Sequence, residues 1–108
     1  MKFTTRVELH QASYEDYNRL HQEMAAEGFS RTITSDDGRV FHLPTAEYNI
    51  DANLTFEQVR DRASRAAAKT HKAYAVLVTE GQVRAWVGLQ EVQNYLAPAL
   101  AGLGFGLR

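Results

Sequence analysis

The first strand-like run of the chain carries a carboxylate and an imidazole two residues apart. In KFTTRVELH, residues 2–10, Glu8 and His10 alternate with apolar residues, and Arg6 precedes them on the same face. A carboxylate beside an imidazole on an open sheet face can perform general acid–base catalysis. The ordinary alternative is the solvated polar face that most exposed strands have.

Residues 60–72, RDRASRAAAKTHK, hold the densest positive charge in the chain. Four cations recur at spacings of three, four and three, so they share one helix face and its exit: Arg62, Arg65, Lys69 and Lys72. Such a stripe can bind phosphates in a salt-dependent way. The alternative is a solvated helix face in which Asp61 and Arg65 form an i,i+4 ion pair.

The run Val83–Leu89 alternates again and is expected to form a last strand, with Arg84 and Trp86 on one face. If this face meets the polar residues of the first strand, Trp86 could stack on a base while Arg84 contacts phosphate. The sequence leaves open whether the two faces meet. A lone tryptophan is more often a packing residue than a stacking platform.

Metal and cofactor signals are weak. The chain has no cysteine, and its four histidines show neither helical metal-ligand spacing nor an H-E-x-x-H motif. We expect no metal site and no cofactor, although a divalent metal held by residues distant in sequence is left open. Asp36 and Asp37 precede Gly38 in the preferred pattern of a hairpin tip, and we interpret them as turn residues. His21 lies near an apolar helix stripe and is interpreted as a packed or half-exposed histidine.

Five strands and two helices are expected to position these residues. The strands are predicted at residues 2–10, 29–35, 39–50, 73–79 and 83–89. Pro44 cannot donate to a ladder and should interrupt the third of them. Capping boxes start the helices, Ser13 with Asp16 and Thr55 with Gln58. The order β-α-β-β-α-β with an added fifth strand favours an α+β, ferredoxin-like sandwich with two helices on one face of an antiparallel sheet.

The length of 108 residues suits one domain, which we place at residues 1–92, followed by a Gly/Leu-rich tail at residues 93–108. The net charge of -1 does not indicate nucleic-acid binding. Residues 1–59 nevertheless contain five Lys/Arg and ten Asp/Glu, a net of -5, whereas residues 60–108 contain seven and three, a net of +4. The sequence shows no membrane-spanning run and no signal-peptide core, so a cytoplasmic protein without membrane contact is expected.

The segment YEDYNRLHQEMAAEGFSRTITSDDGRVFHLPTAEYNI, residues 14–50, resembles the GhoS-type family of type V toxin–antitoxin systems. The residues that carry the resemblance are Tyr14, Met24, Phe29, Ser30, Asp36, Gly38, Leu43, Tyr48 and Ile50. Members are antitoxin endoribonucleases with a ferredoxin-like fold similar to the CRISPR Cas2 proteins. The resemblance implies cleavage of the messenger of a small membrane toxin. It supplies no catalytic motif that carries over to this chain.

We therefore expect a small RNA-binding protein that acts as a sequence-selective endoribonuclease on single-stranded mRNA. In such cleavage a base activates the 2′-hydroxyl and a cation supports the phosphate. The catalytic candidates are Glu8, His10, His42 and Arg39. The RNA-binding candidates are Arg6, Arg62, Arg65, Lys69, Lys72, Arg84 and Trp86.

Two other functions suit the same fold. A non-catalytic, protein-binding regulator of phage or plasmid type would use the sheet edge and the C-terminal tail. A dimeric small-ligand domain would enclose an apolar pocket at a sheet interface. A homodimer is expected in all three cases, because an unpaired last strand at Val83–Leu89 invites pairing across a two-fold axis.

Overall fold

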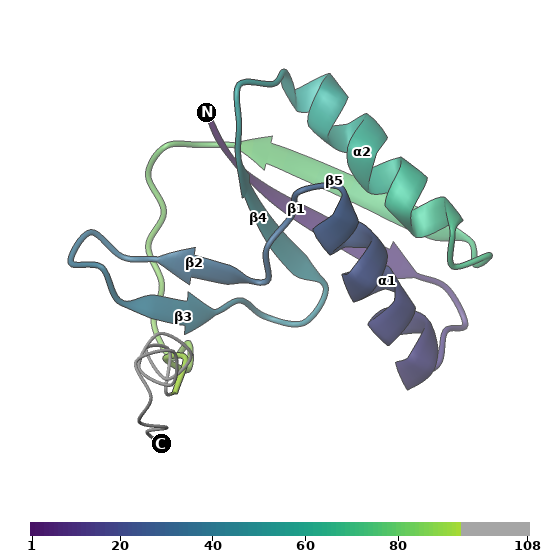
Figure 1. Cartoon of the computed structure of the whole chain (residues 1–108), viewed down its shortest axis with the longest axis horizontal. Helices are drawn as coiled ribbons and strands as arrows, with labels where there is room; N and C mark the ends of the chain where they lie inside the picture. The colour runs from purple at the N-terminus through teal and green to yellow at the C-terminus, as the bar shows by residue number, and fades with distance from the viewer. Residues whose placement is uncertain (94–108) are drawn as a thin grey trace, which may run out of the picture.

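The computed structural model describes residues 1–93, so the predicted tail lies almost entirely outside the described residues. The chain is of the α+β class, and its described part contains two helices and five strands (Figure 1). The elements follow in the order β1 (Lys2–Leu9), α1 (Tyr14–Ala26), β2 (Thr32–Thr34), β3 (Val40–His42), β4 (Glu47–Asp51), α2 (Phe56–Ala68) and β5 (Tyr74–Glu80).

Strand β1 is the centre of a three-stranded antiparallel sheet with the order β4-β1-β5. The predicted alternation is confirmed, because Phe3, Val7 and Leu9 are buried on one face while Glu8 and His10 are exposed on the other. The short strands β2 and β3 form a second antiparallel sheet. A bridge between Ser30 and Asn49 joins the start of this hairpin to β4.

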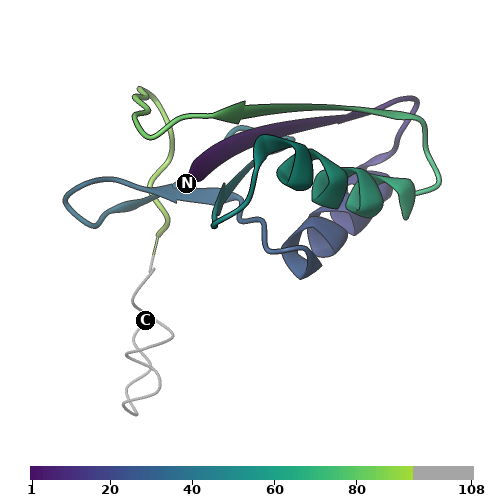
Figure 2. The ribbon, with the colours of Figure 1, turned by 90° about the horizontal axis from the view of Figure 1, so that it is seen from above.

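Both helices cover the same face of the three-stranded sheet, as Figure 2 shows. The two predicted capping boxes are present, with each side-chain oxygen of Ser13 and Thr55 accepting from the backbone N–H three residues on. Helix α2 contacts the sheet through small residues, because Ala63, Ala66 and Ala67 are buried beside Val59. This arrangement is consistent with the predicted ferredoxin-like sandwich, and no helix of the described segment covers the opposite face of the sheet.

The predicted strand at Val83–Leu89 is wrong. The five strands arise instead because the return arm is split at Pro44 into β3 and β4. Residues 82–92, here called the strap, leave β5 as an extended segment and run to the β2–β3 hairpin (Figures 1 and 2). Val83 and Val87 are 90% and 94% exposed. The strap therefore turns its valines to solvent, while Arg84 and Trp86 are partly buried.

The far end of the strap pairs with β3. The N–H of His42 donates to the carbonyl of Gln90 at 2.9 Å, and the N–H of Val92 donates to that of Val40 at 2.8 Å. Arg39 donates to Glu91 at 2.8 Å, which reinforces the backbone contacts. The strap therefore ties the hairpin to the main sheet across the face that the helices leave open.

Candidate functional site

The open face of the sheet presents rows of side chains that cross all three strands. Thr4 of β1 lies in register with Asn49 of β4 and Thr79 of β5. One step further along, Arg6 lies between Glu47 and Leu77. Successive rows are two residues apart, roughly 7 Å along the strand. The polar residues of β1 therefore form a continuous line on this face.

Glu8 and His10 meet at one end of this line. His10 Nε2 lies 3.6 Å from Glu8 Oε1, and the two side chains are 53% and 65% exposed in that order. Arg6 precedes them and lies 3.7 Å from Glu47. A base, its carboxylate partner and a cation thus occupy one accessible row. Such groups can transfer a proton and stabilise a phosphate.

The strap covers the other end of the line. Arg84 donates through Nη1 to Oδ1 of Asn49 and, at 3.4 Å, to Oγ1 of Thr4. The face that carries Arg84 therefore meets the polar face of β1. The sequence alone did not show whether these two faces meet. The ring of Trp86 packs on Phe41 of β3, with centroids 5.5 Å apart and a tilt of 60°.

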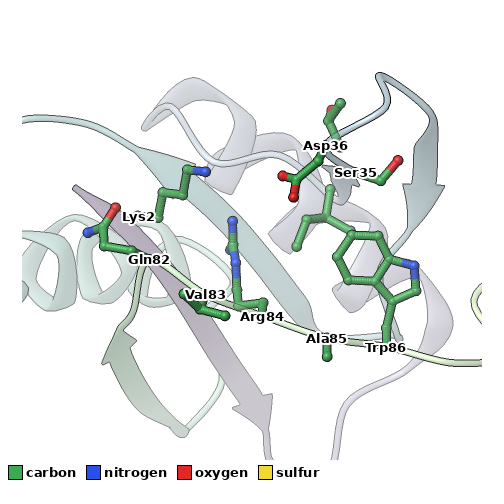
Figure 3. Close-up of a pocket in the computed structure, with 10 residues that line it drawn as sticks. Lys2, Ser35, Asp36, Gln82, Val83, Arg84, Ala85 and Trp86 are labelled. Carbon is green, nitrogen blue, oxygen red and sulfur yellow. The ribbon is translucent and has the colours of Figure 1, made fainter.

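Two cavities flank this part of the strap. The first, about 360 Å³, lies between the strap, the start of β1 and the hairpin tip (Figure 3). Its lining includes Lys2, Ile33, Asp36, Gln82, Arg84 and Trp86. The second, about 340 Å³, shares Ile33, Arg84, Ala85 and Trp86 and extends toward Pro44 and Glu47. Volumes of this size suit a small ligand or one unit of a polymer.

Of the predicted catalytic residues, His42 lies in β3 of the second sheet and Arg39 directly precedes that strand, so neither lies on β1. The guanidinium of Arg39 is engaged twice, with Glu91 and over the ring of Phe41 at 5.3 Å. The hydrogen bond to Glu91 raises the pKa of Arg39 and lowers the pKa of Glu91. In the described residues no hydrogen bond or ion pair links Arg39 or His42 to the Glu8–His10 row.

The predicted basic stripe of α2 faces α1 and forms a ladder of ion pairs with it. Nitrogen–oxygen distances are 3.2 Å for Arg65–Glu27 and 3.6 Å for Lys69–Glu23 and Lys72–Asp16. Arg62 donates to the carbonyl oxygen of Glu27 at 3.3 Å. The Asp61–Arg65 pair does not form, because Asp61 pairs with Arg60 at 2.9 Å. These cations therefore already have carboxylate or carbonyl partners, and RNA binding by them stays a prediction.

The structure also joins two residues that the sequence analysis did not connect. His21 Nδ1 of α1 lies 2.6 Å from the hydroxyl of Tyr48, which is fully buried in β4. Burial, and then the charge of Arg31, lower the pKa of the half-buried His21, so the ring is neutral near pH 7. Burial also raises the pKa of Tyr48. No local signal predicts this pair, because its members are 27 residues apart.

Comparison with known families bears on these positions. A family model described as "Endoribonuclease GhoS" matches residues 1–84. The chain belongs to the GhoS family. The match includes the Glu8–His10 row, the hairpin, both helices and Arg84, and it ends before Trp86. No curated protein matches the chain.

Membership of the GhoS family supports an antitoxin-type endoribonuclease function, for which the substrate is RNA. Among residues 1–93 no helix is long and apolar enough to cross a membrane. The same residues contain no cluster of three or more His, Asp or Glu side chains arranged to hold a metal ion.

Proposed function

We propose that this protein is a cytoplasmic, antitoxin-type endoribonuclease that cleaves single-stranded mRNA laid along the open face of β1. The observation that carries the proposal is the accessible row of Arg6, Glu8 and His10 within the segment matched by the endoribonuclease family. A helix-free sheet face of this kind can receive an extended strand of RNA.

The row supplies the groups that RNA cleavage needs. His10 takes the proton of a 2′-hydroxyl, and the freed oxygen attacks the adjacent phosphorus while the bond to the 5′-oxygen breaks. Glu8 stabilises the imidazolium, 3.6 Å away, which then returns the proton to the leaving oxygen. Arg6 stabilises the charge that develops on the phosphate. The products carry a 2′,3′-cyclic phosphate and a 5′-hydroxyl.

The remainder of the open face holds the substrate. From Lys2 to His10 the strand spans roughly 26 Å at about 3.3 Å per residue, which accommodates several nucleotides. Arg84 lies over the start of this line, and Leu77 beside Arg6 is 65% exposed. Cations that contact phosphates and exposed apolar surface that contacts bases are the usual combination for binding single strands.

The test uses a pool of labelled single-stranded RNAs at low and high salt, with and without chelator. Glu8→Gln and His10→Asn should each abolish cleavage while RNA still binds. Matched controls are Glu57→Gln and His71→Asn, which change the same residue types at exposed positions on or just after α2. Asparagine suits position 71 because the backbone there has a φ of 62°. Cleavage at the wild-type rate by both row variants would refute the assignment.

A homodimer is proposed through a different edge than the sequence suggested. Among the described residues β5 pairs with β1 alone, and the strand from Tyr74 to Thr79 carries no charged side chain. In the ladder between β5 and β1, the N–H of Gly81 donates to the carbonyl of Lys2 and the N–H of His10 donates to that of Ala73. Because every second residue of a strand bonds to the same neighbour, the N–H of Val78 points away from β1, to the free edge. Val78→Pro would block pairing there. Sedimentation showing a wild-type monomer at every concentration would contradict a dimer.

The alternative function is a non-catalytic regulator that binds a protein through this sheet edge and the segment 93–108. Deleting residues 93–108 tests it. A lost protein complex with unchanged RNA affinity would favour this alternative, whereas unchanged cleavage by the shortened chain supports the endoribonuclease.

A further inference from the structure

The cavity between the strap and the hairpin tip has opposite charges on its two sides. Figure 3 shows the ammonium of Lys2 and the guanidinium of Arg84 on one side and the carboxylate of Asp36 on the other. The indole of Trp86 lies on the same side as Asp36 in Figure 3, and the apolar Ile33 also lines the cavity. A ligand that fits has an anionic end, a flat aromatic body and a hydrogen-bond donor edge.

The cationic side has free bonding capacity. Among the described residues Lys2 makes no ion pair, and Arg84 uses only Nη1, toward Thr4 and Asn49. Those two bonds hold the guanidinium in place, while its Nε and Nη2 have no acceptor within residues 1–93. A fixed guanidinium beside a lysine is a suitable site for a phosphate.

The aromatic wall is also fixed in place. Trp86 packs on Phe41, and the strap beyond it is fastened to β3 by the ion pair of Arg39 with Glu91. A ring held in this way presents a face on which a base stacks without ordering the side chain first. Binding therefore costs little side-chain entropy.

The acidic side selects among bases. Asp36 sits at the hairpin tip, whereas its neighbour Asp37 is occupied in the turn, accepting hydrogen bonds from Ser35 Oγ and the N–H of Arg39. An ionised carboxylate only accepts hydrogen bonds. Guanine presents two adjacent donors, N1–H and the N2 amino group, that match its two oxygens. Adenine and cytosine place a ring acceptor beside their amino group, and the N3–H of uracil lies between two carbonyls.

We infer that this cavity is a guanine-nucleotide subsite, in which Trp86 stacks the base, Asp36 accepts from its Watson–Crick edge, and Lys2 with Arg84 binds the phosphate. This inference rests on the proposed RNA function and adds a sequence preference to it. The subsite lies at the Lys2 end of β1, roughly 20 Å from Glu8 at about 3.3 Å per residue. Cleavage should therefore occur at a set distance of a few nucleotides from a guanine.

The test needs no RNA cleavage, because Trp86 is the single tryptophan of the chain and its fluorescence and indole N–H resonance report on the cavity directly. GMP, AMP, CMP and UMP are titrated into the full-length protein. We expect saturable changes, with GMP binding at least about tenfold tighter than the other three, a margin typical of one bidentate base contact.

Two variants in the same turn sharpen the test. Asp36→Asn should remove the preference for GMP while all four nucleotides still bind weakly. Asp37→Asn, the matched control, should keep the preference, because the amide oxygen can still accept the turn hydrogen bonds. Equal affinities for all four nucleotides in the wild type, or an unchanged preference in Asp36→Asn, would overturn the inference.

The outcome separates this inference from the proposed function. Cleavage that persists in a protein that shows no GMP preference rejects the guanine subsite and leaves the endoribonuclease standing. GMP preference that depends on Asp36 in a protein that never cleaves RNA supports the subsite and rejects the enzyme. Arg84→Ala should weaken all four nucleotides together, since it removes a phosphate contact.

Discussion

The cations of the α1–α2 ladder and those of the open sheet face should respond differently to salt. The double variant Arg65→Ala/Lys69→Ala removes two side chains that pair with Glu27 and Glu23. The double variant Lys2→Ala/Arg84→Ala removes two side chains that face the strap cavity. Both variants lose the same formal charge, so they are matched controls for each other.

The expected magnitudes follow from the contacts. Each phosphate contact to a single strand contributes about 0.7 to the slope of log K against log salt, so loss of two contacts lowers the slope by about 1.4. Across a tenfold change in salt this is about a 25-fold change in relative affinity. We expect this effect from Lys2→Ala/Arg84→Ala. The ladder variant should leave the slope nearly unchanged, because its cations are already paired with carboxylates.

The ladder variant should instead change stability. Arg65 and Lys69 are 58% and 57% exposed, so solvent screens both pairs and each contributes only about 0.2–1 kcal/mol. A decrease of a few degrees in Tm is expected.

The assay is fluorescence anisotropy of a labelled single-stranded RNA between low and high salt, with Tm recorded for each variant. A slope lowered by Arg65→Ala/Lys69→Ala and left unchanged by Lys2→Ala/Arg84→Ala would refute this reasoning. This result would support the RNA-binding role that the sequence predicts for α2.

Three further predictions concern stability and the strap. Thr5→Val should raise the free energy of unfolding by about 1 kcal/mol, because the fully buried Thr5 hydroxyl has no hydrogen-bond partner among the residues that the structure describes. Thr4→Val on the open face should not raise it, and denaturant unfolding checks both variants. The pKa of His21 is lowered in the folded state, so the stability that its neutral form contributes is present above the unfolded pKa, about 6.5, and is lost as pH falls toward the lower folded value. Thermal unfolding between pH 7.5 and 5.5 should show this loss, and His21→Gln should show less of it. Glu91→Gln removes the ion pair that fastens the strap, so Trp86 should become more exposed. Its fluorescence should shift to the red and be quenched more readily by added quenchers. An unchanged spectrum would contradict the fastening role.

Local patterns in the sequence predicted much of the fold. The alternation around Arg6, the capping boxes at Ser13 and Thr55, and the Asp–Gly turn at Gly38 all depend on residues within a few positions of one another. Their stabilising contacts are therefore visible in any short window of the chain. The row of Arg6, Glu8 and His10 also follows from period two alone, and the structure places the three on one face.

The last strand shows where that reasoning fails. Val83 and Val87 alternate as a strand would, but in the part of the chain that the structure describes no strand pairs with this segment, and both side chains are exposed. The backbone is stabilised elsewhere, by pairing near Gln90 with β3 and by the inward bond of Arg84. Periodicity describes which side chains share a face, and it does not identify the partner of that face.

Local periodicity and contacts between near neighbours were enough to predict the α+β class, the beginnings of both helices, the hairpin tip and the composition of the open face. The contacts of the charged groups depend instead on how the elements pack together. The tertiary structure placed the α2 cations against Glu23 and Glu27, brought Arg84 over Thr4, and joined His21 to Tyr48. Each of these contacts joins elements far apart in the chain, so its energy depends on how the helices and the strap pack on the sheet.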